Sequence, residues 1–141
     1  MTLISPVVIS ALMALSISTL NTRGCSDIVR NLSVRTYIDL TLKNPDIVLL
    51  QETNNLQETS SCWSLWPYHV HCAPSDSRGT GVATLLKKNR AFEPLISTVV
   101  FQKHILYNKC KINDALFHVY NILVPQDDKK ALECIQSEFL V

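Results

Sequence analysis

The 141-residue sequence lacks a dominant charge of either sign, because 13 lysines and arginines stand against 12 acidic residues and the net charge is +1. It also has no acidic or basic tail and no low-complexity linker, so its overall charge gives no general argument for nucleic acid as a partner. The single basic cluster is "LLKKNR" (85–90). We interpret it as a solvated strand end or turn, with a phosphate-contacting patch as the alternative. Hydrophobic residues make up 47% and charged residues 18%, which indicates one globular domain rather than a disordered chain.

The five cysteines contain no C-x-x-C pair, are odd in number and are irregularly spaced. This pattern argues against a zinc site and against a disulfide framework, and it favours reduced thiols inside a cell. His69 and His71 alternate on one face of an expected strand. Without a third ligand in view, surface histidines are favoured over a shared metal.

The N-terminal run of residues 3–20 is almost wholly apolar or hydroxylic, yet it lacks the lysine or arginine that normally precedes the apolar core of a signal peptide. Pro6 and several serines and threonines also make it a poor membrane span. Its second half alternates as a strand does, so we predict a strand over 14–20 and a leader of unknown role over 1–12. A signal peptide remains the alternative, and an intracellular location without membrane attachment is favoured.

The next segment is typical of a strand–helix–strand unit. A turn around Gly24 is followed by a predicted helix over 28–43, which Ser26 or Asp27 can cap. Its apolar residues at helical spacing are Ile28, Val29, Leu32, Ile38 and Leu42. Pro45 then precedes a strand over 47–50 whose four apolar residues indicate burial on both faces. In such a unit the two strands lie parallel.

The second half of the chain is predicted to form further strands and a final helix. The turn cluster 73–81 joins strands over 68–72 and 82–86 into a hairpin. Later elements are expected at 95–101, 105–112 and 115–125, with an amphipathic helix over 127–141. The sequence therefore predicts one α/β (α+β) domain of mixed sheet with helices outside.

Two glutamates occupy copies of "LQET", Glu52 and Glu58, and their settings differ. Glu52 directly follows the buried strand, at the edge where the preceding strand ends in Asn21. Residues at the carboxyl ends of neighbouring parallel strands converge on one crevice, so Asn21 and Glu52 are the candidate pair. Glu58 lies in a polar stretch without a strand signal and is expected to face water. A plain surface position at a strand end is the alternative for Glu52.

Four segments in order resemble the endonuclease/exonuclease/phosphatase family, which has the DNase-I-like fold. They are "ISTLNTRG" (17–24), "PDIVLLQET" (45–53), "RGTGVATLLKKN" (78–89) and "YNILVP" (120–125). Within the family, the amino-acid sequences of these segments are most similar to the endonuclease domains of non-LTR retrotransposons. The resemblance covers 13–141 and implies a two-sheet sandwich flanked by helices.

The resemblance also implies roles for individual residues. Glu52 matches the ligand of a catalytic Mg²⁺, and Asn21 matches an active-site asparagine that contacts substrate. Gln126 stands where the family commonly has a substrate-binding asparagine. DNA is the implied partner, in the nucleus if the chain is functional, and no stable protein partner is predicted.

Two departures bear on activity. The family usually places a tyrosine, which donates to the scissile phosphate, where this sequence has Leu123. The family's later Asp-x-Asn and Ser-Asp-His do not occur here in the expected order. We therefore expect a truncated domain, 13–141 being its N-terminal part, without the general base that activates water. The alternative is an inactive remnant that at most binds nucleic acid or a partner.

Overall fold

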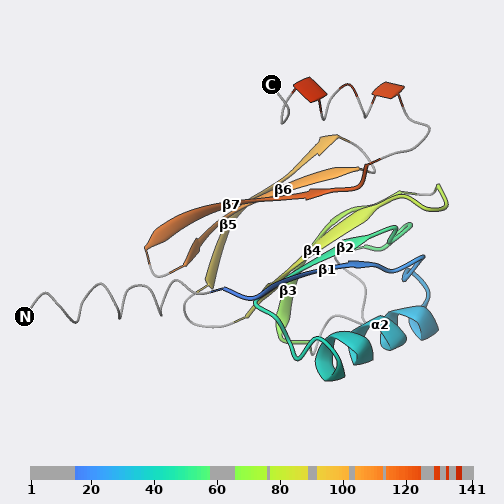
Figure 1. Ribbon diagram of the computed structural model, residues 1–141, viewed down its shortest axis with the longest axis horizontal. Coiled ribbons are helices and arrows are strands. Elements are labelled where there is room, and N and C mark those ends of the chain that lie inside the picture. The colour runs from blue at the N-terminus through green and yellow to red at the C-terminus, as the bar shows by residue number, and fades with distance from the viewer. Residues whose placement is uncertain are drawn as a thin grey trace, which may run out of the picture.

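The structure is a computed structural model that describes residues 15–57, 66–75, 77–88, 92–101, 104–112, 114–124, 129–130, 133 and 136–137. Two β-sheets lie face to face, and the helix α2 covers the outer side of one of them (Figure 1). The predicted two-sheet α/β sandwich is therefore confirmed. No helix among these described residues is long and apolar enough to cross a membrane.

The first sheet has the strand order β1-β2-β4-β3. Its strands are β1 (Ile17–Asn21), β2 (Ile47–Gln51), β4 (Val82–Lys87) and β3 (Tyr68–Ala73). β1 and β2 are parallel and are connected through α2, which confirms the predicted strand–helix–strand unit. β4 pairs antiparallel with both β2 and β3, which confirms the hairpin. The first strand begins three residues later than predicted and includes Asn21.

Helix α2 (Ile28–Leu40) begins where Asp27 caps it, with the Asp27 side chain accepting a hydrogen bond of 3.0 Å from the backbone N–H of Arg30. It ends before the predicted residue 43. The face that packs on the sheet consists of Asn31, Val34 and Ile38. Three of the apolar residues at helical spacing lie outside this face. Ile28, Val29 and Leu32 are 64%, 69% and 50% exposed.

The buried face of α2 includes the polar residue Asn31. This side chain is fully buried, and its Nδ2 donates to the carbonyl of Cys25 at 3.2 Å. A buried amide that forms a hydrogen bond can occupy a core position at modest cost, and hydrophobic periodicity does not reveal it. The helix is consequently rotated toward Asn31, so that Ile38 and the half-buried Leu42 face the core.

The second sheet consists of β5 (Phe92–Phe101), β6 (Ile105–Ile112) and β7 (Ala115–Ile122), paired antiparallel in that order. All three strands were predicted, but β5 begins three residues earlier and β7 ends three residues earlier than expected. The predicted leader 1–12 lies outside the described residues. Of the predicted helix 127–141, the described residues 129–130, 133 and 136–137 are helical and the others lie outside the description.

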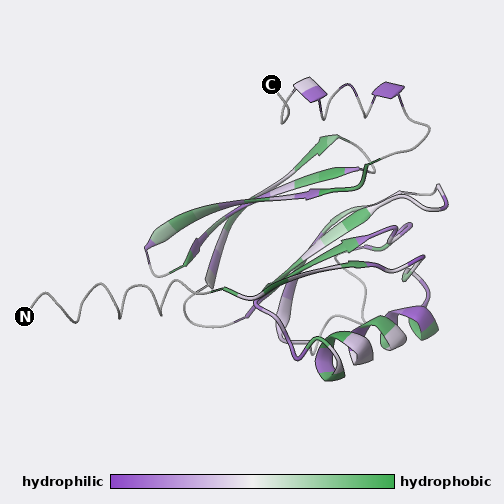
Figure 2. Ribbon diagram, viewed as in Figure 1, coloured by the Kyte–Doolittle hydropathy of each residue, from purple (hydrophilic) through white to green (hydrophobic). Residues whose placement is uncertain are grey.

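The core lies on both sides of the first sheet. On the α2 side, Val48, Leu50 and Leu85 pack with Val34 and Ile38. On the other side, contacts with the second sheet form the core, and its buried members are Ile47, Leu86, Cys110 and Ile112. The strand β2 therefore buries alternate residues on opposite faces, as its apolar run predicted. Figure 2 shows hydrophobic residues along the strands and hydrophilic residues in the loops after β1 and β2.

Candidate active site

The parallel strands β1 and β2 end at the same edge of the first sheet, where Asn21 pairs with Gln51 and Glu52 follows. Backbone hydrogen bonds continue past the strands into the loops. The N–H of Thr22 donates to the Gln51 carbonyl at 2.9 Å, and the N–H of Gly24 donates to the Glu52 carbonyl at 2.7 Å. The backbone of Glu52 is therefore fixed to the loop after β1.

A pocket of about 470 Å³ opens at this edge, and we call it the Glu52 pocket. Three segments of the chain line it: the loop after β1 with the start of α2, the residues after β2, and the turn between β3 and β4. The lining residues are Arg23, Gly24, Ser26, Asp27, Arg30, Glu52, Asn54, Arg78 and Gly79. Three guanidinium groups against two carboxylates leave one net positive charge in the lining.

The Glu52 carboxylate is half-buried, and it forms no hydrogen bond or ion pair with any residue that the structure describes. Its backbone has φ +55°, a left-handed conformation that is unusual outside glycine. Arg23 at φ +54° and Asn54 at φ +58° share this conformation. Such residues cost about 1–3 kcal/mol each and concentrate at functional sites, where the surrounding structure holds them.

Two glycines allow the β3–β4 turn to approach the Glu52 segment. A Cβ on Gly81 would lie 2.5 Å from the Asn54 carbonyl oxygen, and Gly81 has φ +87°. The turn is joined to the segment by backbone hydrogen bonds from Thr53 to Gly81 at 3.1 Å and from Asn54 to Thr80 at 2.7 Å. The N–H of Gly79 also donates to Asn54 Oδ1 at 3.2 Å. This close contact brings Arg78 and Gly79 to the pocket, a role that the sequence did not predict for either residue.

Asn21 lies at the same edge as Glu52, but its side chain does not line the pocket. It is exposed, and its Oδ1 accepts a hydrogen bond of 3.0 Å from the backbone N–H of Arg23. Since Asn21 is in register with Gln51, which reaches the second sheet, it projects from the opposite face of the first sheet to Glu52. Its Nδ2 donates to no described residue, so it can still act as a donor at this edge.

Asn121 of β7 is a structural residue behind the site for which the sequence predicted no role. The side chain is fully buried, and its Nδ2 donates to the carbonyls of Ala83 at 2.8 Å and Leu50 at 3.2 Å. Its Oδ1 accepts from Gln51 Nε2 at 3.1 Å. Asn121 therefore connects the second sheet to β2 and β4, next to Glu52. The quoted segment "YNILVP" contained the signal, since an asparagine within an apolar strand needs hydrogen-bond partners.

Leu123 packs in the apolar cluster of Ala73, Val82 and Leu106 between the sheets. Tyr120, three positions earlier, is 43% exposed and contacts Tyr107, with ring centroids 4.9 Å apart and the ring planes tilted by 31°. Tyr120 and Leu123 therefore lie on opposite faces of the second sheet. Gln126 and Glu58 lie outside the described residues.

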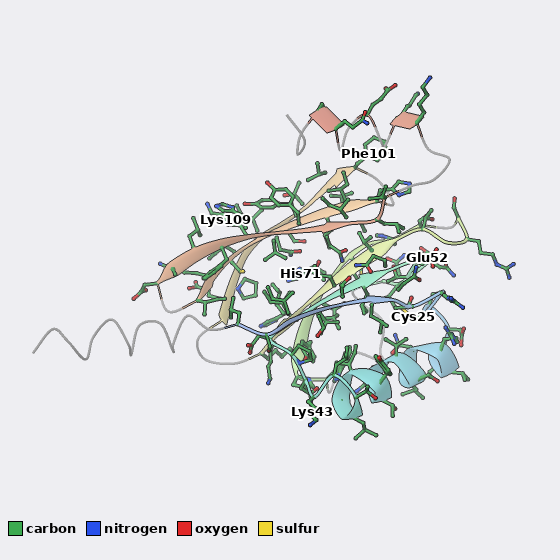
Figure 3. All side chains as sticks on the ribbon, in the orientation of Figure 1. Cys25, Lys43, Glu52, His71, Phe101 and Lys109 are labelled. Atoms are coloured by element: carbon green, nitrogen blue, oxygen red, sulfur yellow. The ribbon has the colours of Figure 1, made fainter. Side chains whose placement is uncertain are left out.

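The described residues contain no group of three or more histidine, cysteine or acidic side chains that could hold a metal by itself. His69 and His71 lie on β3, and burial, with Lys88 nearby, lowers the pKa of His69. Figure 3 places His71 at the layer between the sheets, away from Glu52.

The side chains of the Glu52 pocket fit Mg²⁺ that is bound through a single carboxylate. Mg²⁺ commonly keeps several waters and is bound through one or two carboxylates together with substrate phosphates. Glu52 offers one half-buried carboxylate without a described partner, whereas the other pocket carboxylate, Asp27, caps α2. Glu52 can hold the ion, and water and phosphate would complete its coordination.

The two facing sheets and the parallel β1–β2 pair are the arrangement that the resemblance to the DNase-I-like fold implied. Solved structures confirm this fold over most of the chain. A truncated Caenorhabditis elegans TDP2 superposes with a TM-score of 0.63 and 18% identity, covering 89% of this chain and 53% of TDP2. D. rerio TDP2 with a single-strand DNA product gives 0.61 and 17%, covering 89% and 54%. The AP endonuclease LMAP of Leishmania major gives 0.57 and 14%, covering 89% and 45%.

By sequence, the chain is similar to an uncharacterised 149 kDa protein of transposon TX1 from Xenopus laevis. The two are 31% identical over 114 residues, which is 80% of this chain and 9% of the transposon protein. No protein-family model matches the chain. The resemblance to the family, with a transposon protein as a sequence relative, is thus confirmed. The chain spans about half the length of these solved structures.

Proposed function

We propose that this chain is the N-terminal part of a Mg²⁺-dependent endonuclease domain of retrotransposon origin that hydrolyses phosphodiesters in DNA. The observation that carries the proposal is the half-buried Glu52 carboxylate, without a described partner, in a pocket at the ends of β1 and β2. The solved structures of similar fold support DNA as the substrate class, since one of them is TDP2 with a single-strand DNA product. The transposon relative supports the origin.

In this proposal Glu52 holds Mg²⁺, which when bound polarises the phosphodiester and neutralises charge that grows on its oxygens. Asn21 donates from Nδ2 to a phosphate oxygen, because its Oδ1 is already used by the Arg23 N–H. The arginines of the pocket attract the polyanion. Gln126 provides a further amide contact to the substrate.

Water activation needs a general base, and the proposal assigns this task to the family's Asp-x-Asn and Ser-Asp-His in a following C-terminal half. Those motifs are not in these 141 residues in the expected order. Leu123 has no donor for the scissile phosphate. Leu123 also favours the second candidate function, an inactive remnant that binds nucleic acid or a partner.

The test is plasmid nicking by the chain completed with a family C-terminal half, with and without Mg²⁺. We expect Glu52→Gln to abolish nicking, because the amide is a poor ligand for a hard cation. Glu58→Gln is the matched control and should leave the rate unchanged. Equal loss in both variants contradicts the assignment of Glu52, and nicking that is absent in the unsubstituted protein favours the remnant.

A further inference from the structure

We propose that His104 is a positioning residue that holds the backbone at position 123, where the family resemblance implies the donor to the scissile phosphate. The inference rests on the proposed function and adds to it a residue outside the Glu52 pocket. His104 lies between β5 and β6, and its side chain is buried, with 3% of its surface exposed. Buried polar side chains are generally held by hydrogen bonds, so the partners of this ring indicate its role.

Two hydrogen bonds join His104 to Leu123. The N–H of Leu123 donates to the His104 carbonyl at 2.8 Å, and Nδ1 of His104 lies 3.2 Å from the Leu123 carbonyl oxygen. Since a carbonyl oxygen can only accept, Nδ1 carries the proton in the second bond. The two bonds extend the pairing of β6 and β7 by one residue beyond Ile105 and Ile122, which are the last residues in register at this end.

The side chain of His104 supplies the second bond because its backbone donor is used elsewhere. The N–H of His104 donates to the Phe101 carbonyl at 3.2 Å and closes the turn between β5 and β6. In a regular antiparallel ladder, a hydrogen-bonded pair of residues exchanges two backbone N–H···O bonds. The imidazole therefore replaces the missing backbone donor, and an aliphatic side chain at position 104 would leave the Leu123 carbonyl without it.

The end of β7 that His104 holds lies close to the edge of the first sheet that carries Glu52. Leu123 packs against Val82, and Val82 is in register with Gln51, the residue before Glu52. A misplacement of about 1 Å at a group that acts on the reacting centre can cost on the order of 10²-fold in rate. His104 thus sets the point from which a side chain at position 123 would reach the phosphate.

Hydrogen exchange of the full chain, carried as a fusion with maltose-binding protein, tests whether His104 holds this backbone. Mass spectrometry with fragmentation that resolves single amides measures the exchange. His104→Leu should make the Leu123 N–H exchange about five- to tenfold faster, the effect of one lost hydrogen bond. His104→Asn should restore slow exchange, because the amide nitrogen of asparagine can take the place of Nδ1. An equal increase over all amides of β6 and β7, or no increase, overturns the inference.

Nicking by the completed domain tests the role in the reaction. The gain in kcat expected from Leu123→Tyr should fall about tenfold or more when His104→Leu is added, with KM for DNA little changed. His104→Asn should restore the gain. His118→Leu is the matched control and should leave the gain unchanged, because His118 is an exposed histidine of β7 that bonds to Tyr107.

Two results of this nicking assay count against the role of His104 but leave the proposed function intact. One is a gain of the same size with and without the His104 ring. The other is no gain from Leu123→Tyr while His104 is present. A completed protein that does not nick DNA in its unsubstituted form overturns the proposed function and the positioning role together.

Discussion

Two asparagines of the second sheet, Asn108 and Asn121, are buried between the sheets, with exposed fractions of 1% and 0%. Asn121 forms three good hydrogen bonds, to the carbonyls of Ala83 and Leu50 and from Gln51. Neither side-chain polar atom of Asn108 has a partner in the described part of the chain. The same substitution, asparagine to leucine, should therefore change stability in opposite directions at the two positions.

The magnitudes follow from these contacts. Three hydrogen bonds at about 1 kcal/mol net each give a loss of about 3 kcal/mol in the free energy of unfolding for Asn121→Leu. The free energy of unfolding typically falls by about 2 kcal/mol per molar urea, so this loss lowers the urea midpoint of unfolding by about 1.5 M. A buried amide without partners costs about 1–3 kcal/mol, so Asn108→Leu should raise the midpoint by about 0.5 M or more.

Pulse proteolysis of the chain, carried as a fusion with maltose-binding protein, across a urea gradient measures both midpoints, since only the unfolded chain is cut. Leucine keeps the branched shape of asparagine, so the comparison isolates hydrogen bonding. A fall of 1 M or more for Asn108→Leu, or an unchanged midpoint for Asn121→Leu, refutes the reasoning.

Three further results are expected. Gly81→Ala should destabilise the chain by about 2 kcal/mol or more, because the new Cβ meets the Asn54 carbonyl at positive φ. Gly79→Ala should cost less stability, because the nearest contact of its Cβ is Glu52 Oε1 at 3.6 Å. Equal urea midpoints of unfolding for the two variants contradict this prediction. Leu123→Tyr in the completed domain should raise nicking on the order of 10²–10³-fold with little change in DNA affinity, and no gain means that another group already donates. The 141-residue chain alone should self-associate through apolar side chains exposed on β5 and β7, and a monodisperse monomer in size-exclusion chromatography argues against it. The exposed residues concerned are Leu95, Ile96, Val99, Val100, Leu116 and Tyr120.

The sequence predicted the arrangement of β1, α2 and β2 and the hairpin of β3 and β4, because local patterns determine them. An unbroken apolar run, a proline after a helix and a glycine-containing turn each act over a few residues. The sequence pattern did not reveal the buried face of α2, because that face includes Asn31, whose Nδ2 donates to a backbone carbonyl six residues earlier in the chain. Periodicity counts hydrophobic residues and does not register a polar side chain that finds a partner in the core.

In the candidate site, too, local sequence patterns predicted one part and did not reveal another. The position of Glu52 followed from the end of a buried strand, which the sequence displays directly. The contribution of Arg78 depends on the close approach of a turn 26 positions further along the chain, which needs a glycine at positive φ at residue 81. Asn54 at φ +58° joins that turn through both its backbone and its side chain. Such contacts between distant segments are set by packing and are invisible to local patterns.

Leu123 and Glu52 are held by different parts of the structure, so a change at position 123 need not disturb the fold around Glu52. The backbone of Glu52 and its neighbours is fixed by hydrogen bonds from Gly24 and to the β3–β4 turn. Leu123 is fixed by packing on Val82 and Leu106 and by its backbone, whose N–H donates to the His104 carbonyl at 2.8 Å. A residue can therefore be exchanged at 123 without disturbing the Glu52 pocket, provided that the apolar cluster accommodates it. The Leu123→Tyr variant consequently tests the chemistry at the phosphate, whereas the Glu52→Gln variant tests metal binding.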